Sequence, residues 1–432
     1  MAEQRPGSME MIATTAHPGP AVQITPFIYM SAGTSNSYYV TTEDGDVLIN
    51  AGMDFEAPVH HRKFADVSDG PLRYIVLTQG HVDHVGGVPE YRTEGVQVIA
   101  QRNLRRCQED DRRIPGYRHW RNKVFFGRGV RVTAPEPIVP DIAFDQRYDF
   151  ELGGLRFELH HAPGGETIDN ACVHLPQHDI LFSGNILGPL FPTLPNLYTV
   201  RGDKYRYADA YIETVELLRD LQPEMLITGH FDPITGREHI ARELTRLRDA
   251  VAYVLEETLR GMNAGKNPYE LMREIRLPEG LEVDERYGKV SWDVRGIFES
   301  YGGWFHFDST TELLADAPSA INAEVAALAG VDALTQRARE LLEGGEASHA
   351  IRLAEMALAG DPRHRDALEV YRDAHQVLLE GAGTNMWDVR WLRRQIRGSE
   401  RLLAADPDSE DWARTEGEPR IARWMMDPPE AP

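Results

Sequence analysis

Short apolar runs bounded by turn residues dominate the first half of the chain, and such runs are typical of strands. We expect strands at residues 46–50, 74–78, 96–100, 155–159, 172–175, 180–182 and 225–228. A helical period interrupts them, because Tyr211, Val215 and Leu218 recur at i, i+4 and i+7 before Pro223 ends the pattern. Strands mixed with a helix over residues 20–235 predict a layered α/β or αββα domain.

The pattern changes to a helical one after Gly236. One long helix is expected over residues 238–265, and three consecutive helices over residues 331–342, 347–359 and 365–379. We therefore place a domain boundary near residue 240. The expected organisation is an extended or disordered N-terminus over 1–22, a first domain over 23–240, a helical domain over 241–400 and a loosely ordered tail over 401–432.

Length and composition narrow the class of protein. The 432 residues exceed the ~250–300 that one core usually holds, so at least two domains are expected. The formal charge of -22 disfavours nucleic acid and anionic membranes as partners, and no apolar run approaches the ~18 residues of a membrane span. Two cysteines, Cys107 and Cys172, exclude a disulfide scaffold. Since residues 1–20 lack the apolar core of a signal peptide, we expect a cytoplasmic protein.

The clearest chemical signal follows the second expected strand, where the chain reads Thr78-Gln79-Gly80-His81-Val82-Asp83-His84. Imidazole and carboxylate are ligands of zinc and iron, although surface turns also carry these residue types. Three later turns that follow expected strands carry further polar side chains: Glu166, Asn185 and His230. The repetition of strand and polar loop favours a metal site over an ordinary surface turn.

This order of strands and loops resembles the metallo-β-lactamase superfamily, in which the leading element is usually His-x-His-x-Asp-His. The loop Pro163-Gly-Gly-Glu166 and the run Asn196-Leu-Tyr198-Thr-Val-Arg201-Gly202 are similar to the alkylsulfatase branch. The helical part is similar to the dimerisation domain of that branch at Tyr287-Gly288, Tyr301-Gly-Gly-Trp304-Phe305 and Trp387-Asp-Val-Arg-Trp391. The resemblance implies an αββα metallo-β-lactamase-type sandwich followed by an all-α dimerisation domain, and hence a homodimer.

The resemblance also implies a divalent metal, with zinc as the first expectation and iron or manganese as alternatives. One ion is expected on four side chains: Asp83, His84, Glu166 and His230. A second ion would take the positions of Gln79, His81 and Asn185. Gln79 replaces a histidine, and Asn185 stands where a carboxylate is expected. The site therefore either works with one metal or holds a second one loosely. His160 and His161 are expected to contact the ligands rather than to bind the metal themselves.

For catalysis we expect Asp83 to orient the attacking water while it binds metal, with His81 as the other catalytic candidate. The resemblance implies that Asn196, Tyr198 and Arg201 bind the anionic group of a small substrate, the alternative being that they stabilise their loop. Residues 101–131 carry ten basic and three acidic side chains with interleaved aromatics. This segment is either a solvated helix face or a lid that collects anions; the acidic remainder of the chain disfavours single-stranded nucleic acid.

Three functions remain open at this point. The first is a metal-dependent hydrolase of a sulfate ester or similar anionic ester. The second is a repurposed enzyme (a lyase, another hydrolase or an iron-dependent redox enzyme) acting on a small carboxylate metabolite, which Gln79 and Asn185 motivate. The third is a non-catalytic homologue with a degenerate site, which the intact set of Asp83, His84, Glu166 and His230 argues against.

Overall fold

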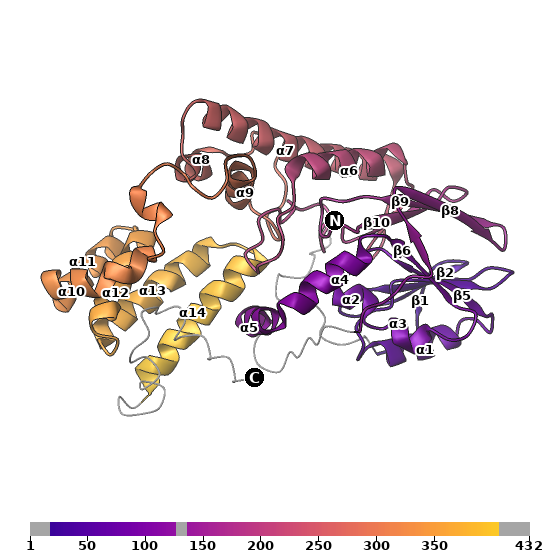
Figure 1. Cartoon of the computed structure of the whole chain (residues 1–432), viewed down its shortest axis with the longest axis horizontal. Helices are drawn as coiled ribbons and strands as arrows, with labels where there is room; N and C mark the ends of the chain where they lie inside the picture. The colour runs from indigo at the N-terminus through magenta and orange to yellow at the C-terminus, as the bar shows by residue number, and fades with distance from the viewer. Residues whose placement is uncertain (1–17, 127–135, 406–432) are drawn as a thin grey trace. The chain divides into compact units, whose positions relative to one another are not determined.

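The computed structural model describes residues 18–126 and 136–405 (Figure 1). The chain divides into two compact units, one over residues 1–115 and 132–304 and the other over residues 116–131 and 305–432. The first unit holds every residue that the sequence marks as a ligand. Among the described residues, none of the helices combines the length and apolar character needed to cross a membrane.

Two β-sheets form the centre of the first unit. The strands of the first sheet lie in chain order: β1 (Val22–Thr25), β2 (Ile28–Ser31), β3 (Ser37–Val40), β4 (Asp46–Ile49), β5 (Leu72–Leu77), β6 (Gln97–Gln101) and β7 (Ile142–Phe144). Those of the second sheet lie in reverse order: β13 (Ile234–Thr235), β12 (Met225–Thr228), β11 (Ile180–Gly184), β10 (Ala171–Leu175), β9 (Leu155–His161) and β8 (Arg147–Leu152). Strands β4 to β7 pair in parallel, and so do β11 and β12.

The alternation of side chains along each strand decides which layer a residue joins. In β3, Tyr38 and Val40 face the core between the two sheets, whereas Tyr39 faces the helices outside the first sheet. Val47 and Leu48 of β4 divide in the same way. Both faces of these strands are buried, which is why their sequences read as continuous apolar runs rather than as alternating ones.

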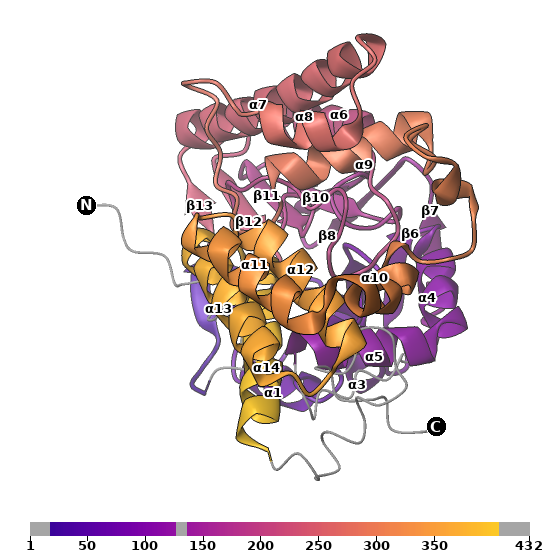
Figure 2. The same ribbon diagram turned by 90° about the vertical axis from the view of Figure 1, so that its left-hand side faces the viewer.

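Helices cover the outer face of each sheet. On the first sheet lie α1 (Ala57–Ala65), α2 (Val82–Val85), α3 (Val88–Tyr91) and α4 (Leu104–Arg113). On the second lie α6 (Ala208–Asp220), α7 (Arg237–Asn263), α8 (Pro268–Glu274) and α9 (Val290–Gly302). Both views place α6 and α7 side by side (Figures 1 and 2). The expected αββα sandwich is confirmed.

The division into compact units differs from the boundary that we expected near residue 240. Leu244, Leu247 and Val251 of α7 pack into one core with Tyr211 and Val215 of α6. The second sheet needs this helical layer to bury its outer face, so the first unit continues through α9 to residue 304.

The second unit is helical. It contains α5 (Pro115–Phe126, from residue 116), α10 (Asn322–Ala329), α11 (Val331–Glu343), α12 (Ala347–Gly360), α13 (Arg365–Gly381) and α14 (Met386–Ala404). Figure 2 shows α11 to α14 as neighbours, and Ala354, Leu358 and Tyr371 lie in their shared core. The expected helices α11 to α13 are confirmed. Helix α14 continues to Ala404, past residue 401, where we expected the tail to begin. Residues 1–17 and 406–432 lie outside the described residues.

Candidate metal centre

The polar loops meet at one edge of the sandwich, where β5, β9, β11 and β12 end. Parallel strands bring their carboxyl ends to the same edge, and backbone hydrogen bonds tie the loops that follow them. The amide of Ala171 donates to the carbonyl of Thr78 at 2.8 Å, which joins the two sheets beside the Gln79–His84 loop. The amide of Gly229 donates to the carbonyl of Gly184 at 2.8 Å. Residues that are distant in sequence thereby share one site.

Asp83, His84 and His230 form a group whose ligand atoms all lie within 4.8 Å of one another. Asp83 Oδ2 is 3.4 Å from His84 Nε2 and 3.9 Å from His230 Nε2. His84 is fully buried, and neither of its ring nitrogens has a hydrogen-bond partner among the described residues. A buried imidazole without partners is costly unless it binds something. One carboxylate and two imidazoles suit zinc or iron, so these residues fit a divalent ion.

The protonation states of this group also suit a metal. Burial lowers the pKa of His84 to about 4 and lowers that of His230 as well, so both rings are neutral near pH 7. Burial opposes ionisation of Asp83, but the neighbouring His84, His230 and His81 outweigh it and lower its pKa. Neutral imidazole and ionised carboxylate are the forms that bind metals.

Asn185 lies beside this group. Its Nδ2 is 3.1 Å from His230 Nε2, and its Oδ1 is buried without a partner among the described residues. Gly229 makes room for it, because a Cβ at that position would lie only 2.0 Å from Asn185 Oδ1. Asn185 and His230, which the sequence assigned to different ions, therefore lie in direct contact.

Glu166 lies elsewhere than the sequence assignment placed it. It is not in the group of Asp83, His84 and His230; its Oε2 lies 3.5 Å from His81 Nδ1. Its carboxylate accepts hydrogen bonds from Arg201 Nη2 at 3.0 Å, Arg206 Nη2 at 2.7 Å and Tyr287 Oη at 2.5 Å. Burial opposes its ionisation, but the two arginines and His81 lower its pKa below the ordinary value. Three hydrogen-bond donors thus surround the buried carboxylate of Glu166. The loop motif alone does not predict these donors, because they come from other parts of the chain.

Three residues of this arrangement were missed from the sequence. Asp203 and Arg206 follow directly after the Asn196–Gly202 run, and Tyr287 belongs to a motif that we had assigned to the helical part. Asp203 Oδ2 lies 3.7 Å from His81 Nε2 and 3.4 Å from Arg201 Nη2. Gly288 lets Tyr287 reach the site, because a Cβ there would lie 1.9 Å from the carbonyl oxygen of Pro195.

Two known families match this chain. Residues 30–230 match the metallo-beta-lactamase superfamily, and residues 267–395 match the alkyl sulfatase dimerisation family. The chain therefore carries a metallo-beta-lactamase superfamily domain and an alkyl sulfatase dimerisation domain.

Several relatives match most of the length of this chain. A linear primary-alkylsulfatase from Pseudomonas sp. is 28% identical over 386 residues, which cover 82% of this chain and 71% of that protein. An alkyl/aryl-sulfatase from Saccharomyces cerevisiae is 25% identical, over 74% of this chain and 54% of that protein, so the chain spans just over half of its length. A stereoselective inverting sec-alkylsulfatase from Pseudomonas sp. shares the fold with a TM-score of 0.78 at 21% identity, over 90% of this chain and 66% of that one.

Two histidines of the superfamily domain were expected to lie behind the ligands. His161 Nε2 lies 2.8 Å from the carbonyl oxygen of Ile168, in the turn that carries Glu166. His160 Nε2 lies 3.8 Å from Glu158, and His160 is not part of the metal-ligand group.

The three predicted substrate-binding residues, Asn196, Tyr198 and Arg201, differ in the contacts that they make. The Tyr198 hydroxyl donates to Glu299 of α9 at 2.8 Å, an arrangement that anchors the loop. Asn196 is 1% exposed, and neither its Oδ1 nor its Nδ2 has a hydrogen-bond partner among the described residues. Arg201 contacts Glu166 as described above. Direct contact of these residues with a substrate stays a prediction.

The basic segment 101–131 falls on both units. On α4, Arg105 pairs with Glu109 at 2.7 Å and Arg113 pairs with Asp110 at 3.4 Å, which is the pattern of a solvated helix face. Residues 116–126 belong to the second unit, and residues 127–131 lie outside the described residues. The lid therefore stays a prediction.

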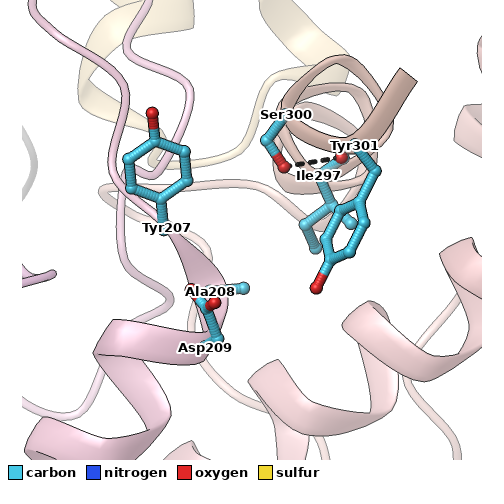
Figure 3. Close-up of a pocket in the computed structure, with 6 residues that line it drawn as sticks. All are labelled: Tyr207, Ala208, Asp209, Ile297, Ser300 and Tyr301. Carbon is cyan, nitrogen blue, oxygen red and sulfur yellow. Dashed lines mark hydrogen bonds between the residues drawn. The ribbon is translucent and has the colours of Figure 1, made fainter. Parts of the chain in front are cut away.

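A separate pocket of about 240 Å³ lies between the start of α6 and the end of α9 (Figure 3). Tyr207 and Tyr301 flank it, and the Ser300 hydroxyl donates to the carbonyl of Ile297 at 2.8 Å. None of the residues that line it is a predicted ligand or substrate contact.

Proposed function

We propose that this protein hydrolyses a small anionic sulfate ester with the help of a divalent metal. The reaction would consume one water and release an alcohol and hydrogen sulfate. The observation that carries the proposal is the convergence of Asp83, His84 and His230 next to the arginines of the Asn196–Arg206 loop. Similarity to a linear primary-alkylsulfatase over 82% of the chain supports the substrate class.

The metal would be held by Asp83, His84 and His230, with Asn185 beside them. When bound, a divalent ion of this kind lowers the pKa of water and polarises a substrate oxygen. The carboxylate of Asp83 also orients the attacking water. His81 is the other catalytic candidate. Its ring lies between Glu166, 3.5 Å from Nδ1, and Asp203, 3.7 Å from Nε2.

Asn196 and Arg201 would bind the sulfate group. The Asn196 carboxamide is buried with its donor and its acceptor both unmatched among the described residues, which is costly unless a ligand supplies the partners. Guanidinium groups match the geometry of sulfate oxygens. Tyr198 contributes by fixing this loop against α9 through Glu299.

Release of inorganic sulfate from medium-chain alkyl sulfates tests the proposal. The wild-type protein loaded with zinc is expected to release sulfate, and Asp83→Asn is expected to lose both its metal and this activity. Asp220→Asn, an exposed carboxylate on the superfamily domain, serves as the matched control and should retain both. No sulfate release by metal-loaded wild-type protein at any chain length would refute the substrate class.

A second candidate is a repurposed enzyme acting on a small carboxylate metabolite. The carboxamides of Gln79 and Asn185 at expected ligand positions favour it, since they change the charge of the site. Iron in natively purified protein, together with no turnover of alkyl sulfates, would support this candidate. Zinc with sulfate release would exclude it.

Three further expectations accompany the proposal. We propose zinc as the native metal, with iron or manganese as the alternatives. The dimerisation domain supports a homodimer, which the molar mass in solution would test. The cytoplasm is the location expected from the composition, and fractionation of the cells would test it.

A further inference from the structure

Glu166, which the sequence assigned to the first ion, lies instead beside His81 of the expected second position, and its carboxylate is already paired with protein cations. Glu166 Oε2 accepts from Arg201 at 3.0 Å and from Arg206 at 2.7 Å, while Tyr287 donates to Oε1 at 2.5 Å. Arg206 Nε also donates to the backbone carbonyl of Glu166 at 2.9 Å. The side chains of Arg206 and Glu166 are each only 2% exposed. Both carboxylate oxygens thus have donors within the protein.

Asp203 completes a charge-balanced cluster. Its Oδ2 lies 3.4 Å from Arg201 Nη2 and 4.0 Å from Arg206 Nη2. Two carboxylates and two guanidinium groups therefore share this half of the site, and their charges cancel. In the other half, the carboxylate of Asp83 lies beside the imidazole nitrogens of His84 and His230, at 3.4 and 3.9 Å, which is a set of metal-ligand atoms. Electrostatics favour a divalent ion in that half and repel one from the arginines.

The orientation of Gln79 excludes it as a ligand toward His81. Asn170 Oδ1 accepts from the backbone amides of Glu166 at 3.1 Å and Thr167 at 2.6 Å, so Asn170 Nδ2 is the end left to donate. It donates to Gln79 Oε1 at 2.9 Å. Gln79 Nε2 consequently lies toward His81, 3.3 Å from Nδ1. An amide nitrogen carries no lone pair for a metal, and the oxygen that could bind one is already engaged.

We propose that the centre is mononuclear, and that the guanidinium groups of Arg201 and Arg206 occupy the cation position that a second metal would take. The inference rests on the proposed function for the ion at Asp83, His84 and His230. It decides between the two possibilities that Gln79 and Asn185 left open in the sequence. The ion bound there would be the single metal of each chain.

Metal stoichiometry tests the inference independently of turnover. The full-length protein is dialysed against excess zinc, freed of weakly bound ions and measured by elemental analysis; one equivalent per chain is expected. The double variant Gln79→His/Asn185→Asp supplies better ligands but keeps both arginines, so it should still bind one. Adding Arg206→Met to these changes should raise the content to two, because one of the two guanidinium groups that balance Glu166 and Asp203 is then lost. Arg206→Lys in the same background keeps the charge and should bind one.

The outcomes separate this inference from the proposed function. Two tightly held ions in the wild type, or one ion in a folded triple variant, would overturn the inference. If the triple variant does not fold, Arg201→Met in the same double background should bind two, and one ion there would equally overturn it. No metal in the wild type would overturn both ideas, whereas one metal without sulfate release would refute only the substrate class. Anomalous scattering at the zinc edge should give one peak, between Asp83, His84 and His230.

Discussion

The hydrogen bond from Tyr287 to Glu166 is short, buried and directed at a charge, so its removal should be costly. Tyr287→Phe deletes the donor to Glu166 Oε1 at 2.5 Å and keeps the ring, which is 3% exposed. Hydrogen bonds to charged groups contribute about 1.5–3 kcal/mol, so we expect the free energy of unfolding of the first unit to fall by about 2 kcal/mol. For a unit of this size, that corresponds to a drop in Tm of roughly 4–8 °C.

Tyr211→Phe is the matched control. Tyr211 is also fully buried in the first unit, but its hydroxyl has no hydrogen-bond partner among the described residues. Removing that hydroxyl should be neutral or slightly stabilising, because a buried unmatched polar group is itself costly.

Both variants are compared with the wild type by thermal and urea unfolding at pH 7, with one equivalent of zinc present. Burial and the neighbouring Glu166 raise the pKa of Tyr287 to about 12, so the hydroxyl remains a donor throughout the assay range. If the two variants differ by less than about 0.5 kcal/mol, which is the usual range of neutral substitutions, the role assigned to Tyr287 is wrong.

Three further predictions concern the same unit. The pKa of Glu166 is lowered in the folded state, so its ionised form stabilises the fold above the ordinary pKa and this stabilisation is lost as the pH falls through the folded value. The free energy of unfolding of Glu166→Gln should therefore be about 3–5 kcal/mol lower than that of the wild type at pH 7. In urea titrations this difference should close as the pH falls below the ordinary pKa of a glutamate. A difference that stays constant with pH would contradict the pairing with the arginines. Gly288→Ala would place a Cβ 1.9 Å from the Pro195 carbonyl oxygen, and the Tm of this variant should fall. Gly116→Ala, a control in the second unit, meets no atom within 4 Å and should not lower the Tm. Burial and Asp169 raise the pKa of Cys107, so iodoacetamide should alkylate it much more slowly at pH 8 than a denatured control, and equal rates would refute the buried environment.

Local patterns in the sequence were enough to predict seven of the thirteen described strands and to mark the polar residues that follow several of them. The apolar run of β5 ends at Leu77, and the polar residues from Gln79 to His84 follow it at once, so strand and loop are readable together. The same holds for Asn185 after β11 and for His230 after β12. Because each of these signals involves a strand and the few residues after it, no knowledge of distant contacts is needed. The division into compact units could not be predicted in this way, since α7 belongs to whichever core its apolar face packs into.

The sequence by itself determined that a layered α/β domain precedes a helical one and that several strand ends carry metal-binding residue types. The tertiary structure decided which of them act together. Glu166 lies 40 residues from Arg206 and 121 from Tyr287, and only the packing of the Asn196–Arg206 loop and the Tyr287–Gly288 segment brings all three into contact. The charge of a metal site is the sum over every group that surrounds it. A motif reports the ligands that it contains, whereas the buried cations that compete with a metal for those ligands come from elsewhere in the chain.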